Sequence, residues 1–214
     1  MRAVIGDDHS QWKPMAGCFA PGTPLYNEEG GEILKGPRRF DLAKRLLAEA
    51  GYAGEPITLM AAQDIPYAKV WGEVTVNLLQ HLGVKVDYAA VDFGTLIARR
   101  TQKSPPNQGG WHMYVDGGFG IDLAYPTVRL FRADGNQPNG WASSAQVETE
   151  VAAWFDAKSA DEEKTIARRL NKACLDHVLY APLGVFLRHY AWRKNVSGIV
   201  PAPLPLFWGV SKTA

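Results

Sequence analysis

The fold is decided by residues 57–92, which read ITLMAAQDIPYAKVWGEVTVNLLQHLGVKVDYAAVD. The apolar run at residues 57–61 predicts a short buried strand. Apolar residues at a four-residue spacing then predict a helix that begins near Pro66 and ends at Gly83. Residues 84–90 alternate apolar and polar side chains, which predicts a second strand. A strand, a helix and a strand in this order are typical of a parallel sheet with a right-handed crossover.

Further helices and strands are predicted on both sides of this unit. Asp41, Asp92 and Ser159 each stand where a side chain can cap the start of a helix. A strand is predicted at residues 111–115, after a loop rich in Pro, Asn and Gly, and the last third of the chain is mostly helical. We therefore expect a single α/β domain with a mixed, largely parallel sheet that is flanked by helices.

The two ends of the chain are irregular in sequence. Residues 7–37 are rich in Gly and Pro without periodicity, and we expect residues 1–37 to form an irregular arm that packs on other structure. Residues 38–198 form the predicted α/β body. Residues 199–214 carry several prolines, which cannot donate to a sheet ladder, so an extended tail is predicted. This apolar tail is expected either to fold back on the domain or to bury itself in a neighbouring molecule.

Composition excludes several classes of function. The chain has 214 residues with 23 Lys plus Arg and 22 Asp plus Glu, so its net charge does not point to nucleic acid or an anionic membrane. No apolar run approaches the ~18 residues that span a bilayer. The two cysteines, Cys18 and Cys174, could form one disulfide in an exported protein, or could be buried free thiols.

The segment after the strand at 111–115 is the strongest candidate for a binding site. It reads GGFGIDLAYP over residues 117–126, so an aromatic ring and a carboxylate follow the strand on glycine-rich backbone. Ligands of open α/β sheets bind at such strand exits. Phe119 offers a ring face and Asp122 a carboxylate for a cation. The alternative is a glycine-rich turn in which Asp122 caps the next helix.

Three other aromatic residues are weaker candidates. Trp141 lies in a polar loop before a helix, where it either lines the binding cleft or packs as a hydrophobic staple for that helix. Phe93 and Trp111 are further candidates for ligand contact, and core packing is the alternative for both.

Motifs for catalysis and for cofactors are missing from the sequence. The five histidines lack the spacing of metal ligands, and we expect no metal site. Neither cysteine lies in a nucleophile motif, and no G-x-S-x-G is present. No complete glycine-rich dinucleotide motif or Walker A sequence occurs, so no cofactor is predicted.

Several short motifs occur in the order in which one known family carries them. They are Asp41–Tyr52, Leu78–Val86, Asp92–Leu96, residues 117–126, Tyr180–Gly184 and Phe207–Val210. Each motif alone is weak, but the ordered set resembles the oligopeptide- and dipeptide-binding proteins, the extracytoplasmic solute-binding proteins that feed ABC importers. The resemblance covers the C-terminal lobe only, and we expect the N-terminal lobe and the secretion signal to lie outside this chain.

The resemblance implies one lobe of a periplasmic-binding-protein-like fold, in a periplasmic or extracytoplasmic location. Such a lobe is not an enzyme and carries no cofactor. Together with an N-terminal lobe it captures peptides or similar small solutes and delivers them to an ABC permease. Nucleic acid is not an expected partner. The family places an aromatic residue beside the ligand at Phe119 and a carboxylate for the peptide α-amino group at Asp122. The family usually has Trp at the first position and often an acid where Tyr125 stands, so the ligand class is open.

Two alternatives belong to other classes of protein. One is a small α/β hydrolase or transferase in which Asp122 acts as the acid or base with His112 nearby, although no motif supports it. The other is a lobe that acts alone as an interaction module.

Overall fold

The computed structural model describes residues 1–137 and 140–213 of the chain. Its helices are α1 (Arg2–Ile5), α2 (Phe40–Glu49), α3 (Pro66–His81), α4 (Phe93–Arg99), α5 (Ala145–Asp156) and α6 (Ala160–Asp176). Its strands are β1 (Trp12–Lys13), β2 (Ile57–Ala62), β3 (Val86–Val91), β4 (Met113–Tyr114), β5 (Val185–Phe186), β6 (Val196–Ser197) and β7 (Ser211–Lys212). The 3-10 turns are η1 (Gly31–Leu34), η2 (Pro106–Gln108), η3 (Gly120–Leu123) and η4 (Arg129–Phe131).

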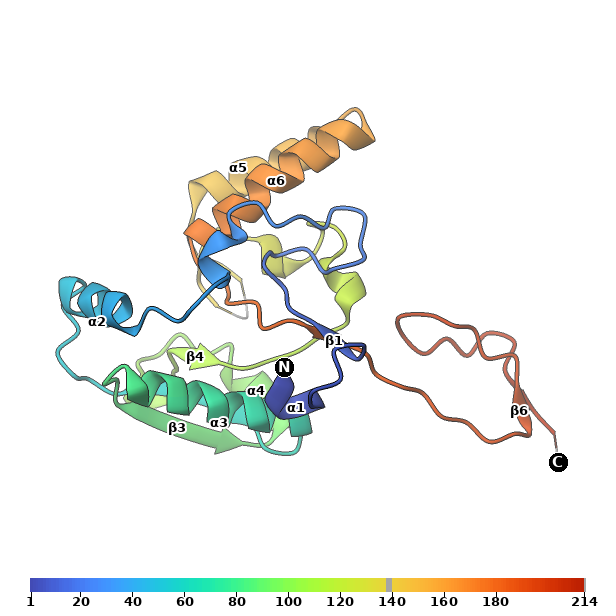
Figure 1. The fold of residues 1–214 in the computed structure, drawn as a ribbon, viewed down its shortest axis with the longest axis horizontal. Helices are drawn as coiled ribbons and strands as arrows, with labels where there is room; N and C mark the ends of the chain where they lie inside the picture. Colours follow the sequence, from blue (N-terminus) through green and yellow to red (C-terminus); the bar gives the residue numbers. More distant parts are fainter. Residues whose placement is uncertain (138–139, 214) are drawn as a thin grey trace.

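A parallel sheet with the order β3-β2-β4 forms the first packed part, which we call the sheet region (Figure 1). In its register Leu59 of β2 lies opposite Tyr88 of β3 and Met113 of β4. The predicted strand at 111–115 is shorter in the structure, although the backbone N–H groups of His112 and Val115 still donate to carbonyls of β2. The predicted α/β class, with a parallel sheet flanked by helices, is confirmed.

The middle strand β2 is buried on both faces. Leu59 packs with Trp71 of α3, whereas the next residue, Met60, packs with Leu96 of α4. Since consecutive side chains of a strand point to opposite faces, α3 and α4 cover the two faces of the sheet. Gly72 allows α3 to lie close, because a Cβ there would be 2.6 Å from the Cβ of Ala61.

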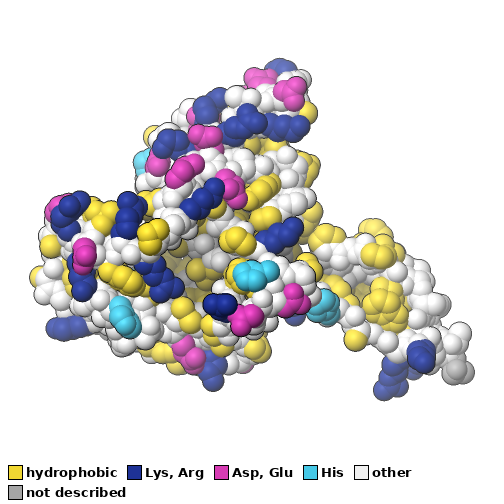
Figure 2. Space-filling model, viewed as in Figure 1, with side chains coloured by type: hydrophobic (Ala, Val, Ile, Leu, Met, Phe, Trp, Pro, Cys, Tyr) yellow, Lys and Arg dark blue, Asp and Glu magenta, His cyan; other side chains and the backbone are white. Residues whose placement is uncertain are grey.

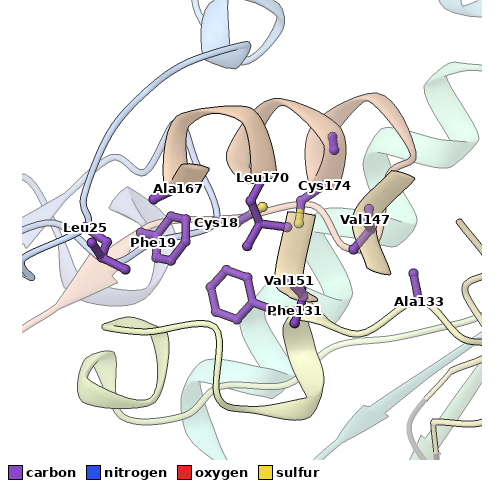
Figure 3. Close-up of a cluster of buried hydrophobic side chains, with 11 residues drawn as sticks. Cys18, Phe19, Leu25, Phe131, Ala133, Val147, Val151, Ala167, Leu170 and Cys174 are labelled. Carbon is purple, nitrogen blue, oxygen red and sulfur yellow. The ribbon is translucent and has the colours of Figure 1, made fainter. Parts of the chain in front are cut away.

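The helices α5 and α6 form a hairpin that builds the second packed part, the helical region (Figure 1). Its core also takes in side chains from the arm and from the segment before α5 (Figure 3). The buried members of this core are Cys18, Phe19, Leu25, Phe131, Ala133, Val147, Val151, Ala167, Leu170, Ala173 and Cys174. The arm therefore packs deeply on other structure, although it has almost no regular secondary structure of its own.

Helix starts follow the predicted capping residues in two of three cases. The side chains of Asp92 and Ser159 accept backbone N–H groups of the first turns of α4 and α6, which confirms both caps. The prediction for Asp41 is wrong, because α2 begins at Phe40 and Asp41 lies inside its first turn. An acid in that turn still interacts favourably with the positive end of the helix dipole.

The C-terminal segment runs away from the sheet region and the helical region. β5 pairs antiparallel with β1, and residues 187–213 then run outward as what we call the extension (Figure 1). Near its end β6 pairs antiparallel with β7. Hydrophobic side chains lie over its surface (Figure 2), and Phe207 and Trp208 are 76% and 80% exposed. No helix in the described part of the chain has both the length and the apolar composition that a bilayer crossing requires.

Candidate ligand-binding site

The loop that follows β4 connects the sheet region to the helical region. Val115 packs in the sheet region, and Phe131 is buried in the core of the helical region. Gly117 lies against Tyr67 of α3, since a Cβ at this position would be 2.8 Å from the tyrosine ring. A glycine is therefore required where the loop leaves the sheet, at the carboxyl end of its strand.

Phe119 and Asp122 are presented to solvent by this loop. Phe119 directly precedes η3 and is 41% exposed, and its carbonyl accepts the N–H of Asp122 at 3.0 Å. Asp122 lies inside η3 and is exposed, so it does not stand at the start of a helix and capping does not account for it. Within residues 1–137 and 140–213, no hydrogen bond to its carboxylate is found.

Asp122 and Arg129 are among the residues that line an open hollow of about 310 Å³. Thr127, Val128 and Leu130 form the remainder of the wall. The structure shows no ion pair between Asp122 and Arg129 in the described part of the chain. A carboxylate and a guanidinium at one hollow can together hold a ligand that carries both a cationic and an anionic group.

Trp111 and Trp141, two of the candidate residues, lie far apart in sequence but contact each other in the structure. Their ring centroids are 5.0 Å apart with an interplanar angle of 35°, and Lys103 Nζ lies 5.7 Å from the Trp141 ring centroid. Trp111 also contacts Tyr114 edge-on and donates its indole N–H to the carbonyl of Arg100. The pair is partly buried against the sheet region.

The predicted site residues fall at two ends of the sheet. Phe93 follows β3 and Phe119 follows β4, so both belong to the edge formed by the carboxyl ends of the strands. Trp111 precedes β4 and lies with Trp141 towards the opposite end. Phe93 is partly exposed at the start of α4, and its backbone N–H donates to Asp64.

Charged residues at the loop were not singled out from the sequence. Asp116, two residues after β4, accepts from Arg100 at 3.1 Å. Burial raises the pKa of Tyr114, and the nearby negative charge of Asp116 raises it further. The position of Asp116 at a strand exit beside a glycine is the same signal that indicated Asp122. Arg100 gave no such signal, because only the folded chain brings it to this loop. Arg129 belongs to the loop itself, but its place at one hollow with Asp122 depends on the turns η3 and η4.

A metal centre finds no support in the geometry. No group of three or more His, Cys, Asp or Glu side chains in residues 1–137 and 140–213 is arranged to hold a metal ion. The arrangement at the loop is instead a ring face, a carboxylate and a guanidinium on an open surface.

Comparison with known proteins gives the family context. No protein-family model matches the chain. A probable peptide ABC transporter periplasmic-binding protein of Sinorhizobium fredii is 29% identical over 214 residues, which are 99% of this chain and 40% of the relative. A dipeptide-binding protein from Pseudoalteromonas, solved in complex with Met-Leu, matches the whole chain and 42% of its own length, with a TM-score of 0.72 and 18% identity. The chain has the fold of one lobe of a periplasmic solute-binding protein.

Another solved structure has the same fold with a different ligand. AgaA of A. tumefaciens, in complex with agropinic acid, matches 92% of the chain with a TM-score of 0.66 and 18% identity, over 40% of its own length. The chain thus spans about two fifths of the relatives it matches, which fits a single lobe. The resemblance predicted from the motifs is confirmed, because the relative is described as a periplasmic-binding protein of a peptide transporter and the two solved structures are binding proteins as well.

Proposed function

We propose that this chain is the ligand-binding lobe of an ABC-importer substrate-binding protein that captures peptides or similar small solutes in the periplasm. The observation that carries the proposal is the exposed pair Phe119 and Asp122 on the loop between the two packed regions. Asp122 accepts a cationic group such as a peptide α-amino group, and Phe119 supplies apolar contact. Capture takes place between two lobes that close about a hinge.

The proposed ligands follow from the relatives and from the loop. The S. fredii relative is described as a peptide transporter protein and the Pseudoalteromonas protein holds a dipeptide, which favours a peptide here. AgaA holds agropinic acid on the same fold, so similar small solutes are included. Trp141, Phe93 and Trp111 remain predicted ligand contacts. Trp111 and Trp141 form an aromatic surface that is separate from Phe119 and Asp122.

Binding without catalysis is part of the proposal. An enzyme that uses Asp122 as acid or base with His112 nearby requires the two side chains to converge. His112 precedes β4 and its Nδ1 accepts the backbone N–H of Thr58 at 2.9 Å, whereas Asp122 follows the other end of the strand. The relative and the solved structures are themselves described as binding proteins.

The proposed partners are an N-terminal lobe of the same protein and an ABC permease in the membrane. The extension supports the first, because its exposed Phe207 and Trp208 form an apolar surface of the kind that is covered in a mature protein. We assign this surface to the other lobe, since the chain spans only about two fifths of its relatives. Light scattering compares the chain with a version that ends at Val200. Self-association that is lost on truncation supports an unpartnered apolar surface, whereas self-association that persists contradicts it.

The ligand proposal is tested by calorimetry with an unmodified dipeptide. One lobe lacks the second wall of contacts and the exclusion of water, so we expect a dissociation constant in about the millimolar range. Asp122→Asn is expected to weaken binding by about tenfold or more, because a charge-assisted hydrogen bond is lost. Phe119→Ala is expected to weaken it further through lost apolar contact.

Two controls separate a specific site from general charge. Asp156→Asn removes an exposed carboxylate at the end of α5 and should leave binding unchanged. N-acetylation of the peptide should cost as much as Asp122→Asn, and the two changes together should cost little more than either alone. Additive losses would show that Asp122 does not meet the amino group, and turnover of the peptide that is lost with Asp122→Asn would favour the enzyme alternative.

A further inference from the structure

The only two cysteines of the chain meet in the core of the helical region. Cys18 comes from the arm and Cys174 from α6, and both side chains are fully buried. Their sulfur atoms lie side by side (Figure 3). Both thiols are free in this structure.

The backbone of Cys18 is held in place by hydrogen bonds to residues on either side of Cys174 in sequence. The N–H of Cys18 donates to Asn171 Oδ1 at 2.6 Å, and the hydroxyl of Tyr180 donates to the carbonyl of Cys18 at 2.9 Å. Gly17 leaves no room for a shift, because a Cβ there would be 2.5 Å from the carbonyl oxygen of Asn27. The arm is thus held against α6 at the position where the two sulfurs meet, which favours a bond between them.

We propose that Cys18 and Cys174 form a disulfide bond when the protein folds in an oxidising compartment. The proposal depends on the proposed function in one respect only, which is the location of the protein in the oxidising periplasm. Disulfides form and persist in extracytoplasmic compartments such as the periplasm. The bond would tie the irregular arm to α6 and close a loop that contains most of the chain.

The reaction is a thiol–disulfide exchange with a disulfide oxidant. The thiolate of Cys18 attacks one sulfur of the oxidant and releases the other as a thiol, which gives a mixed disulfide. The thiolate of Cys174 then attacks Cys18 and releases the second thiol of the oxidant. The two cysteines lose two protons and two electrons, and the oxidant gains them. The same products form if Cys174 attacks first, because the exchange is symmetrical in the two cysteines.

Burial determines when the exchange takes place. In the folded chain neither sulfur is accessible, so oxidation occurs while the helical region is still forming. Closing so long a loop restricts the unfolded chain strongly, and we expect the oxidised protein to melt about 10 °C above the reduced one.

The experiment refolds the full chain from denaturant with oxidised and reduced glutathione, or with a thiol reductant alone. Alkylation under denaturing conditions is followed by mass measurement, and thermal unfolding is recorded for both samples. We expect the glutathione sample to contain a chain two hydrogens lighter with no alkylated cysteine, and with the higher melting temperature. Cys18→Ala and Cys174→Ala are the matched controls, and neither should show a difference in melting temperature between the two conditions.

Folded chain with two alkylated cysteines after refolding in the glutathione buffer would overturn the proposal, as would an oxidised form that melts below the reduced one. The measurement uses purified protein and needs neither a ligand nor a cell. Its failure would therefore leave the proposed function intact, and a failure of peptide binding would leave the disulfide intact.

Discussion

The sheet region and the helical region are both built on fully buried side chains, but they are assembled from different parts of the chain. In the sheet region β2, α3, β3 and α4 follow one another in sequence and pack on their neighbours. In the helical region the arm packs on α6, which lies near the other end of the chain. Most contacts of the first region are local, although Met1 and Phe186 from near the two ends of the chain also pack on it. The second region combines the local hairpin of α5 and α6 with contacts from the distant arm.

The loop with Phe119 and Asp122 is the direct link between these two assemblies. It begins at the sheet and ends at Phe131, which is fully buried in the helical region. Its position is therefore fixed at both ends, while its exposed middle stays available to a ligand. Binding residues carried by a loop on a rigid scaffold are a common arrangement in proteins.

The largest effect is expected from the polar residue that holds the helical region together. Asn171 is fully buried, accepts from Cys18 and donates to the carbonyl of Glu29 at 2.7 Å. Asn171→Ala leaves these groups without a partner and opens a cavity, so we expect a loss of about 3 kcal/mol in the free energy of unfolding. Denaturant unfolding measures it. Asn77→Ala on the exposed face of α3 is the matched control and should cost below about 0.5 kcal/mol. Equal effects would contradict the assembly described for the helical region.

A smaller effect is expected from close packing in the sheet region. Gly72→Ala places a Cβ 2.6 Å from both Ala61 and the Tyr88 hydroxyl, which forces α3 away from the sheet. Overpacking costs about 1–3 kcal/mol, and the better helix propensity of Ala returns up to about 1 kcal/mol, so a net loss of about 1–2 kcal/mol is expected. Glu73→Ala, next on the helix and exposed, should change little. A stabilised Gly72→Ala variant would show that α3 does not lie this close.

The smallest effect concerns an ion pair near the start of α5. The Arg132 guanidinium, at 2.6 Å, lowers the pKa of Glu148, and the N–H of Ala133 lowers it further. A depressed carboxyl pKa stabilises the fold above the unfolded value of about 4.3, and the contribution is lost as the pH falls through the folded value. Glu148→Gln should therefore cost more at pH 7 than at pH 3, by at most about 1 kcal/mol for so exposed a pair.

Denaturant unfolding of the unmodified chain and of Glu148→Gln at pH 7 and at pH 3 measures this cost. In an Arg132→Met background the difference between pH 7 and pH 3 should shrink. A cost of Glu148→Gln that is the same at both pH values would contradict the role of the ion pair.

The sequence predicted the sheet region well because its signals are local. The helix from Pro66 and the strands around it depend on periodicity and on Pro and Gly as boundaries. In the helical region the same signals correctly predicted the cap of α6 at Ser159. They could not show what packs on that helix, because the arm has no periodicity and its hydrogen bonds come from Asn171 and Tyr180, far along the chain.

The candidate site shows the same limit. The sequence indicated that Phe119 and Asp122 are exposed, because they lie on glycine-rich backbone after a predicted strand. The approach of Arg129 to the same hollow, and of Arg100 to Asp116, required the folded chain. The predicted strand at 111–115 separates Trp111, at its start, from Phe119, after its end. The sequence did not show that Trp141 lies against Trp111 and so away from Phe119.

The most direct test of the account is a titration of the ¹⁵N-labelled chain with an unmodified dipeptide, followed by NMR. If the loop between the two regions binds the ligand, the backbone amides of Gly117, Gly118, Gly120 and Asp122 shift first, and Asp122→Asn suppresses these shifts at the same peptide concentration. Amides of α2, which lie away from the loop (Figure 1), stay unchanged. Shifts confined to other surfaces, or no shifts at millimolar peptide, would contradict the assignment of this loop as the ligand-binding site.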